Sequence, residues 1–339
     1  MESSTARQLN RTPVSPSHMN KTLTRKYLYD AKWLWLSCAA ILYAFCWLRV
    51  WIVSRFDMSR FQKVLEQFEH LERFFPIPIE ELTTYTGRIA ITFDEPLVVT
   101  CIVIWAIARG SDCVSGELGR GTLELLLAQP ISRVRLFWTH ASMTILGIAS
   151  LVLMAWLGTC TGIATCHVTE KTPVTMELPL VDLEVPNPLA KPKEVVRPMS
   201  ELTSSWHFLP AVTNLFCLGF FIAGLACLMS SWDRYRWRTI GIVVGIYLIQ
   251  MVFYIAGLAA EQLSWLLHCT FFTSYEPELF VNIMLRSPQR LWDLLQFDAE
   301  GHYERPGPLG SHLLLLVLGS CCFLAATLLF RRRDLPAPI

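Results

Sequence analysis

Long apolar runs without charge alternate with short charged segments along the chain. Four stretches contain no Asp, Glu, Lys or Arg, and each is at least 22 residues long: 136–169, 202–232, 239–260 and 306–330. About 20 apolar residues of helix cross the hydrocarbon core of a bilayer, so each stretch can hold one membrane span.

Two weaker apolar runs precede these four. The first is interrupted by Arg49, and the second has Asp94 and Glu95 near its start. Together the runs predict an all-α polytopic membrane protein with six transmembrane helices, at about 33–53, 89–109, 136–160, 208–230, 239–260 and 311–330.

Composition supports a membrane protein and excludes several other classes. Apolar residues make up 53% of the 339 residues and charged residues only 17%, whereas soluble domains carry roughly 25% charge. A disordered chain, a secreted disulfide scaffold and a cytosolic enzyme are therefore excluded. The net charge of +1 gives no indication of nucleic-acid binding. The 11 cysteines are scattered, and most lie in apolar runs, where they act as small hydrophobic residues.

The distribution of basic residues predicts the topology. If the N-terminus is cytoplasmic, the inner segments hold 16 Lys and Arg in 76 positions, and the outer segments hold 12 in 128. Cytoplasmic loops carry the excess of basic residues, so both termini are expected in the cytoplasm of a multi-pass plasma (inner) membrane protein. The expected extracytoplasmic loops are 54–88, 165–207 and 261–310.

Residues 1–32 are expected to form a cytoplasmic leader, and 33–339 a single six-span membrane domain. Within the leader, Leu23, Tyr27 and Leu28 share one helical face, which fits an amphipathic helix on the membrane surface. A charged flank that only anchors the first span is an equal alternative.

The three outer loops have different patterns. Residues 57–75 have the apolar spacing of an amphipathic helix. Six prolines exclude a continuous helix from 165–207, which is expected to be extended. The third loop begins with an apolar piece too short to span and is expected to be re-entrant or interfacial.

The connection between spans two and three contains the most informative segment. Leucines at 118, 123 and 125–127 form an apolar helical side, and Glu117, Arg120 and Glu124 form a charged side. Pro130 should end this helix near residue 129, and Ser132 is placed to cap the next one. The pattern predicts a short amphipathic helix beneath the membrane, either a surface float or a docking ridge for a cytosolic partner.

This segment resembles a known family. Gly116 and Glu117, followed by GTLELLLAQPISR at 121–133, resemble the signature of ABC transporter permease subunits of the type-2 exporter superfamily, near the copper-maturation and gliding-motility permeases. The six-span layout and the basic ending at 331–333 are also similar, whereas the proline-rich loop is longer than is usual in the family. The resemblance implies that an ATPase grips the coupling helix, formed or positioned by Glu117, Gly121, Thr122, Glu124, Pro130 and Arg133.

The resemblance also implies the partners. A separate cytosolic ATPase dimer would bind ATP-Mg, because this chain contains no GxxxxGK[ST] motif and no cofactor is expected in it. A second permease copy or a sister permease would complete the transporter, expected to be an exporter. A non-transporting scaffold or mechanotransmission subunit remains an alternative. A polytopic membrane enzyme is a weaker one, because no HExxH or GxSxG motif is present.

Few chemically reactive groups fall inside the spans. Cys160, Cys166 and His167 lie close together but lack a fourth ligand, so no metal site is predicted. Arg49 is expected to pair with Asp94 or Glu95 across spans one and two, because all three lie roughly 6–9 Å below the outer surface and charges at that depth are costly. The alternative is that these side chains extend to the headgroups.

Overall fold

The computed structural model describes residues 16–55, 84–129, 131–172, 175–178, 183–186, 193–297 and 303–333. Within these ranges, six helical segments are long and apolar enough to cross a membrane. They are Thr22–Arg55, Tyr85–Gly119, Arg133–Thr165, Ser205–Trp232, Arg236–Ala259 and Pro308–Arg332. The predicted all-α polytopic architecture is confirmed, and each predicted span overlaps one segment.

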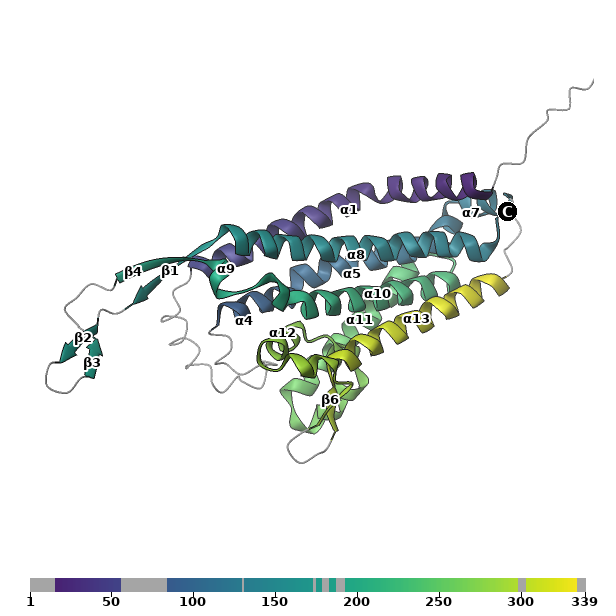
Figure 1. Ribbon diagram of the computed structural model, residues 1–339. Helices are drawn as coiled ribbons and strands as arrows, with labels where there is room; N and C mark the ends of the chain where they lie inside the picture. The colour runs from purple at the N-terminus through teal and green to yellow at the C-terminus, as the bar shows by residue number, and fades with distance from the viewer. Residues whose placement is uncertain are drawn as a thin grey trace, which may run out of the picture.

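The long helices lie side by side in a bundle (Figure 1). They are α1 (Pro16–Arg55), α5 (Pro96–Ser111), α8 (Arg133–Thr165), α10 (Leu209–Trp232), α11 (Arg236–Ala259) and α13 (Pro308–Arg332). The start of α1, the end of α13 and the short helix α7 (Thr122–Leu127) lie at one end of the bundle, here the α7 end. Strands β1 (His167–Thr172) and β4 (Lys193–Pro198) extend from the opposite end, here the β4 end.

The second span is assembled from several helical pieces. It begins with α4 (Tyr85–Ala90) and a 3₁₀ turn at Ile91–Phe93, and then α5 starts with a proline in its first turn. After α5 come a π-helical turn at Asp112–Gly116 and α6 (Glu117–Gly119). Proline is tolerated at a helix start because the first N–H groups have no intrahelical partner. The segment therefore extends beyond the predicted 89–109 at both ends.

Small residues allow the bundle helices to approach closely. A Cβ added to Gly158 of α8 would lie 2.4 Å from the Tyr43 carbonyl oxygen of α1. A Cβ added to Gly224 of α10 would lie 2.7 Å from the Gly319 carbonyl oxygen of α13. Such contacts are typical of membrane helices. Lipid tails are as apolar as the helix side chains, so helices associate through close packing.

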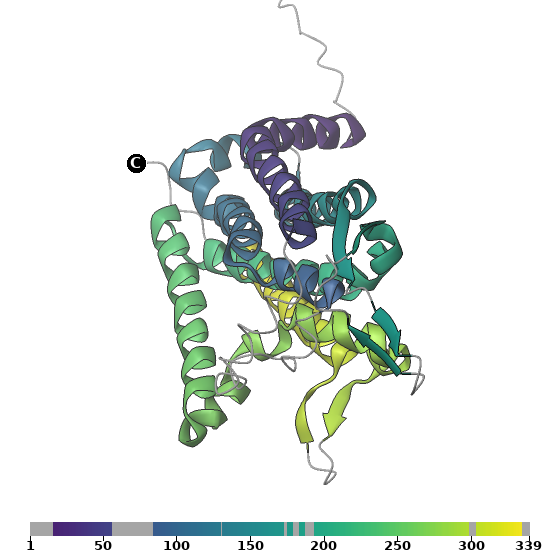
Figure 2. The same ribbon diagram turned by 90° about the vertical axis from the view of Figure 1, so that its left-hand side faces the viewer.

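Helix α11 is separated from the rest of the bundle along much of its length (Figure 2). Of the 18 most apolar consecutive residues of α11, only 11% are buried, whereas 61% are buried in the corresponding stretches of the second and fourth spans. Its exposed apolar residues include Leu248, Ile249, Val252 and Ile255.

The segment between α8 and α10 forms strands instead of an unpaired extended loop. Strand β1 pairs antiparallel with β4, and β2 (Thr175–Leu178) pairs antiparallel with β3 (Leu183–Pro186). The chain returns through α9 (Met199–Leu202) and a 3₁₀ turn at Ser205–Phe208. The described residues of this segment form no continuous helix, as expected. The predicted amphipathic helix at 57–75 lies outside the described residues.

The segment between α11 and α13 is mostly helical. It contains 3₁₀ segments at Glu261–Cys269, Phe271–Ser274 and Pro288–Trp292, with α12 (Pro277–Arg286) between the last two. Strands β5 (Leu295–Phe297) and β6 (Tyr303–Pro306) then pair antiparallel.

The leader helix and the first span form one helix. Helix α1 continues through residue 32 without a break, and in Figure 2 its first turns run across the end of the bundle. Leu23 and Tyr27 are buried, whereas Leu28 is 58% exposed, so the three do not share one environment.

Candidate functional site

The connection between α5 and α8 is a broken helix with one exposed ridge. Gly121 adopts a left-handed conformation with φ of 69° and separates α6 from α7. The short helix predicted to contain Leu118 and to end near residue 129 is therefore interrupted, because a left-handed residue cannot continue a right-handed helix. Helix α7 ends at Leu127, and the Ser132 side chain accepts a hydrogen bond from the Arg135 N–H at the start of α8, as predicted. Pro130 lies outside the described residues.

Helix α7 presents two kinds of side chain. Leu123 is fully buried and anchors the helix to the bundle. Glu124 is exposed, and Leu125 is 70% exposed. Glu124 and Leu125 therefore form a ridge on the surface of the α7 end.

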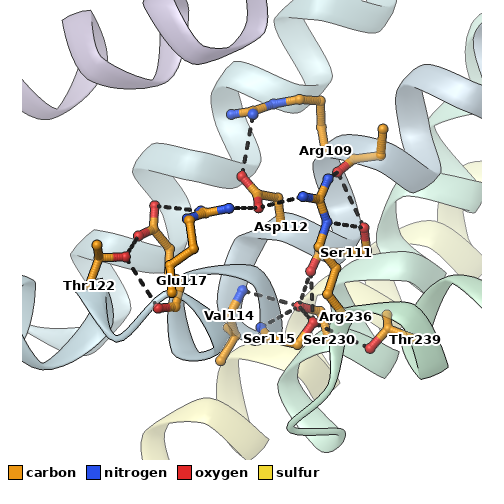
Figure 3. A network of polar contacts seen from close by, with 12 residues as sticks. Arg109, Ser111, Asp112, Val114, Ser115, Glu117, Thr122, Ser230, Arg236 and Thr239 are labelled. Carbon is orange, nitrogen blue, oxygen red and sulfur yellow. Dashed lines mark hydrogen bonds and ion pairs between the residues drawn. The ribbon is translucent and has the colours of Figure 1, made fainter.

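Glu117 belongs to the interior and not to the charged face that its spacing predicted. Its carboxylate is 1% exposed and accepts a 2.9 Å hydrogen bond from Lys26 Nζ of α1. Arg120 Nη2 lies 3.3 Å from the same oxygen, and the Thr122 hydroxyl donates to the second one. Because three donors surround it, this carboxylate joins the leader turns of α1 to the start of α7. Figure 3 shows its contact with Thr122.

Asp112, in the π-helical turn, is a second buried carboxylate with three basic neighbours. Its oxygens lie 2.7 Å from Arg120 Nη1, 3.4 Å from Arg236 Nη1 and 3.5 Å from Arg109 Nη1. Arg109 also contacts His140 Nε2 of α8 at 3.2 Å. Asp112 therefore links the end of α5 with the connection and with the start of α11 (Figure 3).

We refer to these residues as the charge network: Lys26, Arg109, Asp112, Glu117, Arg120 and Arg236. The network has four basic groups and two acidic ones, and both acids are buried. The hydrogen bond to Asp112 raises the pKa of the Arg120 guanidinium. A buried carboxylate is tolerated only when it is paired, so loss of one partner is strongly destabilising. The network therefore holds four helical elements in a fixed arrangement.

A set of hydroxyl contacts reinforces the π-helical turn. Ser230 Oγ of α10 accepts hydrogen bonds from the N–H groups of Val114 (3.1 Å) and Ser115 (2.9 Å) and donates to the Ser111 carbonyl (3.0 Å). Ser115 Oγ lies 3.3 Å from the Thr239 hydroxyl of α11. The N–H groups left free by a π turn thus find partners on neighbouring spans.

Arg133, at the start of α8, is bonded to the residue that follows α13. Its Nη1 donates a 2.6 Å hydrogen bond to the Arg333 carbonyl oxygen, just after α13. Arg333 Nη1 in turn donates to the carbonyl oxygen of Ser231, in the last turn of α10, at 3.0 Å and to that of Asp233, directly after α10, at 3.1 Å. Arg133 therefore links the start of α8 to the end of α13 and, through Arg333, to the end of α10.

The other predicted charges lie at the β4 end. Arg49 Nη2 of α1 is 3.0 Å from Glu95 Oε1, directly before α5. Asp94 is exposed and forms no ion pair with any described residue. Nearby Glu278 of α12 is 6% exposed, and burial, followed by the Asp94 carboxylate, raises its pKa to about 8. Glu278 therefore remains mostly protonated at pH 7.

Among the predicted site residues, Glu117 and Thr122 are in contact, Gly121 and Glu124 are close by in sequence, and Arg133 lies after α7. Sequence reasoning missed Lys26, Asp112 and Arg236 as partners. The signal available was the acid at 112, in the helical segment that continues the second span, where a charge requires a partner. The position of that partner depends on the fold. No group of metal-ligating side chains occurs in the described ranges.

The described fold is that of a polytopic membrane protein with a structured, charged connection between its second and third spans. The family model of the ABC-2 family transporter proteins matches residues 25–335, and the chain belongs to this family. It is thus a membrane permease subunit of an ABC transporter, a class that works with a partner ATPase and whose membrane subunits are generally not ATPases themselves. No curated protein matches the chain.

Proposed function

We propose that this chain is the permease of an exporter and that α7 receives the movement of a separate cytosolic ATPase dimer. The observation that carries the proposal is the charge network behind the exposed ridge of Glu124 and Leu125. Glu117 and Asp112 join the connection that holds this ridge to α1, α5 and α11 by ion pairs of 2.7–3.5 Å. A force applied to α7 is therefore transmitted to several spans and does not merely bend a loop.

The topology in the proposal follows the distribution of basic residues. The α7 end carries Arg234 before α11, Arg236 and Arg238 in the first turn of α11, and Arg331–Arg333 at the end of α13. The positive-inside rule assigns this end to the cytoplasm of the plasma membrane, together with both termini. An ATPase bound at α7 would then have access to ATP-Mg. The direction of export rests on the resemblance of residues 116–133 to type-2 exporters.

The proposal includes a second copy of this chain. ATP is hydrolysed between two ATPase subunits, and one chain offers a single α7. Helix α11 provides a surface for pairing because Gly241 and Gly245 lie one turn apart and a Cβ at either would have no neighbour within 4 Å. Small residues four apart on an exposed membrane helix are typical of helix–helix interfaces. A sister permease with a similar helix is the alternative partner.

A mechanotransmission subunit is the second candidate function. Helix α8 begins at the connection and, at its other end, leads directly into strands β1 to β4, which project beyond the bundle (Figure 1). A movement of α7 could reach this projection along a single helix. The two candidates share the coupling at α7 and differ in whether a cargo crosses the bundle.

The coupling is tested by reversing charge on the ridge without disturbing the network. Glu124→Lys is compared with Glu201→Lys, which makes the same change at an exposed position of α9 at the β4 end. Both variants should insert and elute as wild type. With Glu124→Lys, a Walker-type ATPase should no longer co-purify with the permease. The vanadate-sensitive ATP hydrolysis of the complex should fall at least about tenfold. Unchanged association and hydrolysis in Glu124→Lys would contradict the proposed coupling.

A further inference from the structure

A cavity of about 620 Å³ lies beside the charge network, between α1, α5 and α8. Its volume is within the range of small-molecule sites. Its walls are mainly carbon atoms, from side chains that include Ala31, Trp35, Trp105 and Met143. Two lining residues, Leu28 and Leu146, are 58% and 59% exposed. The cavity is therefore open sideways, where lipid would surround the bundle.

The walls of the cavity are fixed by specific contacts. Trp105 Nε1 donates a 3.1 Å hydrogen bond to the Thr144 carbonyl, and Trp35 Nε1 donates a 2.8 Å bond to Ser150 Oγ. The Trp105 ring also lies over Gly147, where an added Cβ would be 2.1 Å from a ring carbon. Both indole N–H groups are thus satisfied within the wall, and the rings present their apolar surfaces to the cavity. The cavity is preformed.

One side of the cavity is basic. Lys32 and Arg109 contribute to its lining, and Lys32 Nζ lies 3.7 Å from the centre of the Tyr29 ring and has no acidic partner in the described part of the chain. Arg109 belongs to the charge network, in which basic groups outnumber acidic ones. Tyr27 lines the same side, is 1% exposed, and its hydroxyl has no hydrogen-bond partner among the described residues. The surplus of basic over acidic groups and the buried, unpaired Tyr27 hydroxyl both favour a polar, anionic ligand.

We propose that this cavity is a binding site for an anionic phospholipid, with one acyl chain between α1, α5 and α8 and the headgroup phosphate on the Lys32 side. The apolar walls match an acyl chain, and the sideways opening lets it enter from the bilayer. The basic side lies near the end of the spans, at the level where headgroups reside. The proposal needs neither the ATPase nor the assigned topology, because it concerns whichever leaflet adjoins the α7 end.

The site is tested by native mass spectrometry of the full-length protein, purified with equal amounts of phosphatidylglycerol and phosphatidylcholine. Wild type should retain phosphatidylglycerol in preference. Lys32→Ala should weaken this retention about fivefold, since one basic residue near the surface contributes this much to anionic lipid binding. Leu146→Trp, which fills the opening, should reduce retention of the same lipid without removing charge. Monodisperse elution and an unchanged unfolding temperature establish that each variant is folded.

Arg234→Ala is the matched control, because Arg234 is exposed and basic and does not line the cavity. It should retain phosphatidylglycerol like wild type. The proposal is overturned if Lys32→Ala and Arg234→Ala behave alike, or if phosphatidylcholine is retained equally well by wild type. Displacement of the lipid by millimolar inorganic phosphate would also overturn it, since the site would then bind a free anion without a chain.

Discussion

Two glutamates near α7 show how strongly the role of a charged residue depends on its surroundings. Glu117 and Glu124 fall within one short amphipathic pattern. In the structure, Glu117 is enclosed by Lys26, Arg120 and Thr122, whereas Glu124 faces outward. Glu117 is thus a structural centre of the connection, and Glu124 is the residue available to a partner. A substitution at Glu117 tests stability, and one at Glu124 tests recognition.

We expect Glu117→Ala to lower the free energy of unfolding by about 2–3 kcal/mol, because the buried carboxylate and its hydrogen bonds from Lys26 and Thr122 are lost. Glu124→Ala should change the same free energy by no more than about 0.5 kcal/mol. Reversible denaturant unfolding in detergent, followed by intrinsic fluorescence, measures both. Equal effects of the two substitutions would show that the network contributes little to stability.

At the scale of elements, the six spans could be predicted because hydropathy is a local property of about 20 residues. The connection could be predicted only in part. Pro130 and Ser132 indicated where α7 ends and α8 begins, since both act on neighbouring backbone groups. The break at Gly121 depends on a single torsion angle, and the burial of Glu117 depends on Lys26, which lies 91 residues away. Neither leaves a periodic signal in the sequence.

The break at Gly121 is expected to matter for the position of α7. Gly121→Ala should lower the unfolding free energy by about 1–2 kcal/mol, because a Cβ is strained at a φ of 69°. Gly119→Ala is the matched control, since Gly119 is helical and a Cβ there has no neighbour within 4 Å. That substitution should be neutral or stabilise by up to about 1 kcal/mol.

The same pair of variants separates geometry from stability. If the break sets the position of α7, Gly121→Ala should also reduce ATP hydrolysis by the assembled complex, measured below its unfolding temperature, while Gly119→Ala retains it. Similar unfolding curves and similar hydrolysis for both alanine variants would show that α7 does not need the break.

At the scale of the whole molecule, α11 has two distinct parts. Its first turn carries Arg236, which contacts Asp112 in the charge network, and Thr239, which contacts Ser115. The rest of the helix diverges from the bundle and exposes an apolar face (Figure 2). The helix therefore connects the α7 end with the surface proposed for pairing. A displacement of α7 would reach a second subunit along α11 without crossing the bundle interior.

We expect the pairing surface to include Gly241 and Gly245. A Gly241→Ile, Gly245→Ile double variant should separate the helices, because close approach requires small side chains, and overpacking of this kind costs about 1–3 kcal/mol. Association should weaken about tenfold or more, measured as energy transfer between differently labelled copies in native membranes. Ser320→Ile is the control, since it also enlarges a small exposed residue, on α13. It should leave energy transfer at the wild-type level. Absence of energy transfer in wild type, or equal losses in the α11 and α13 variants, would contradict pairing of two copies through α11.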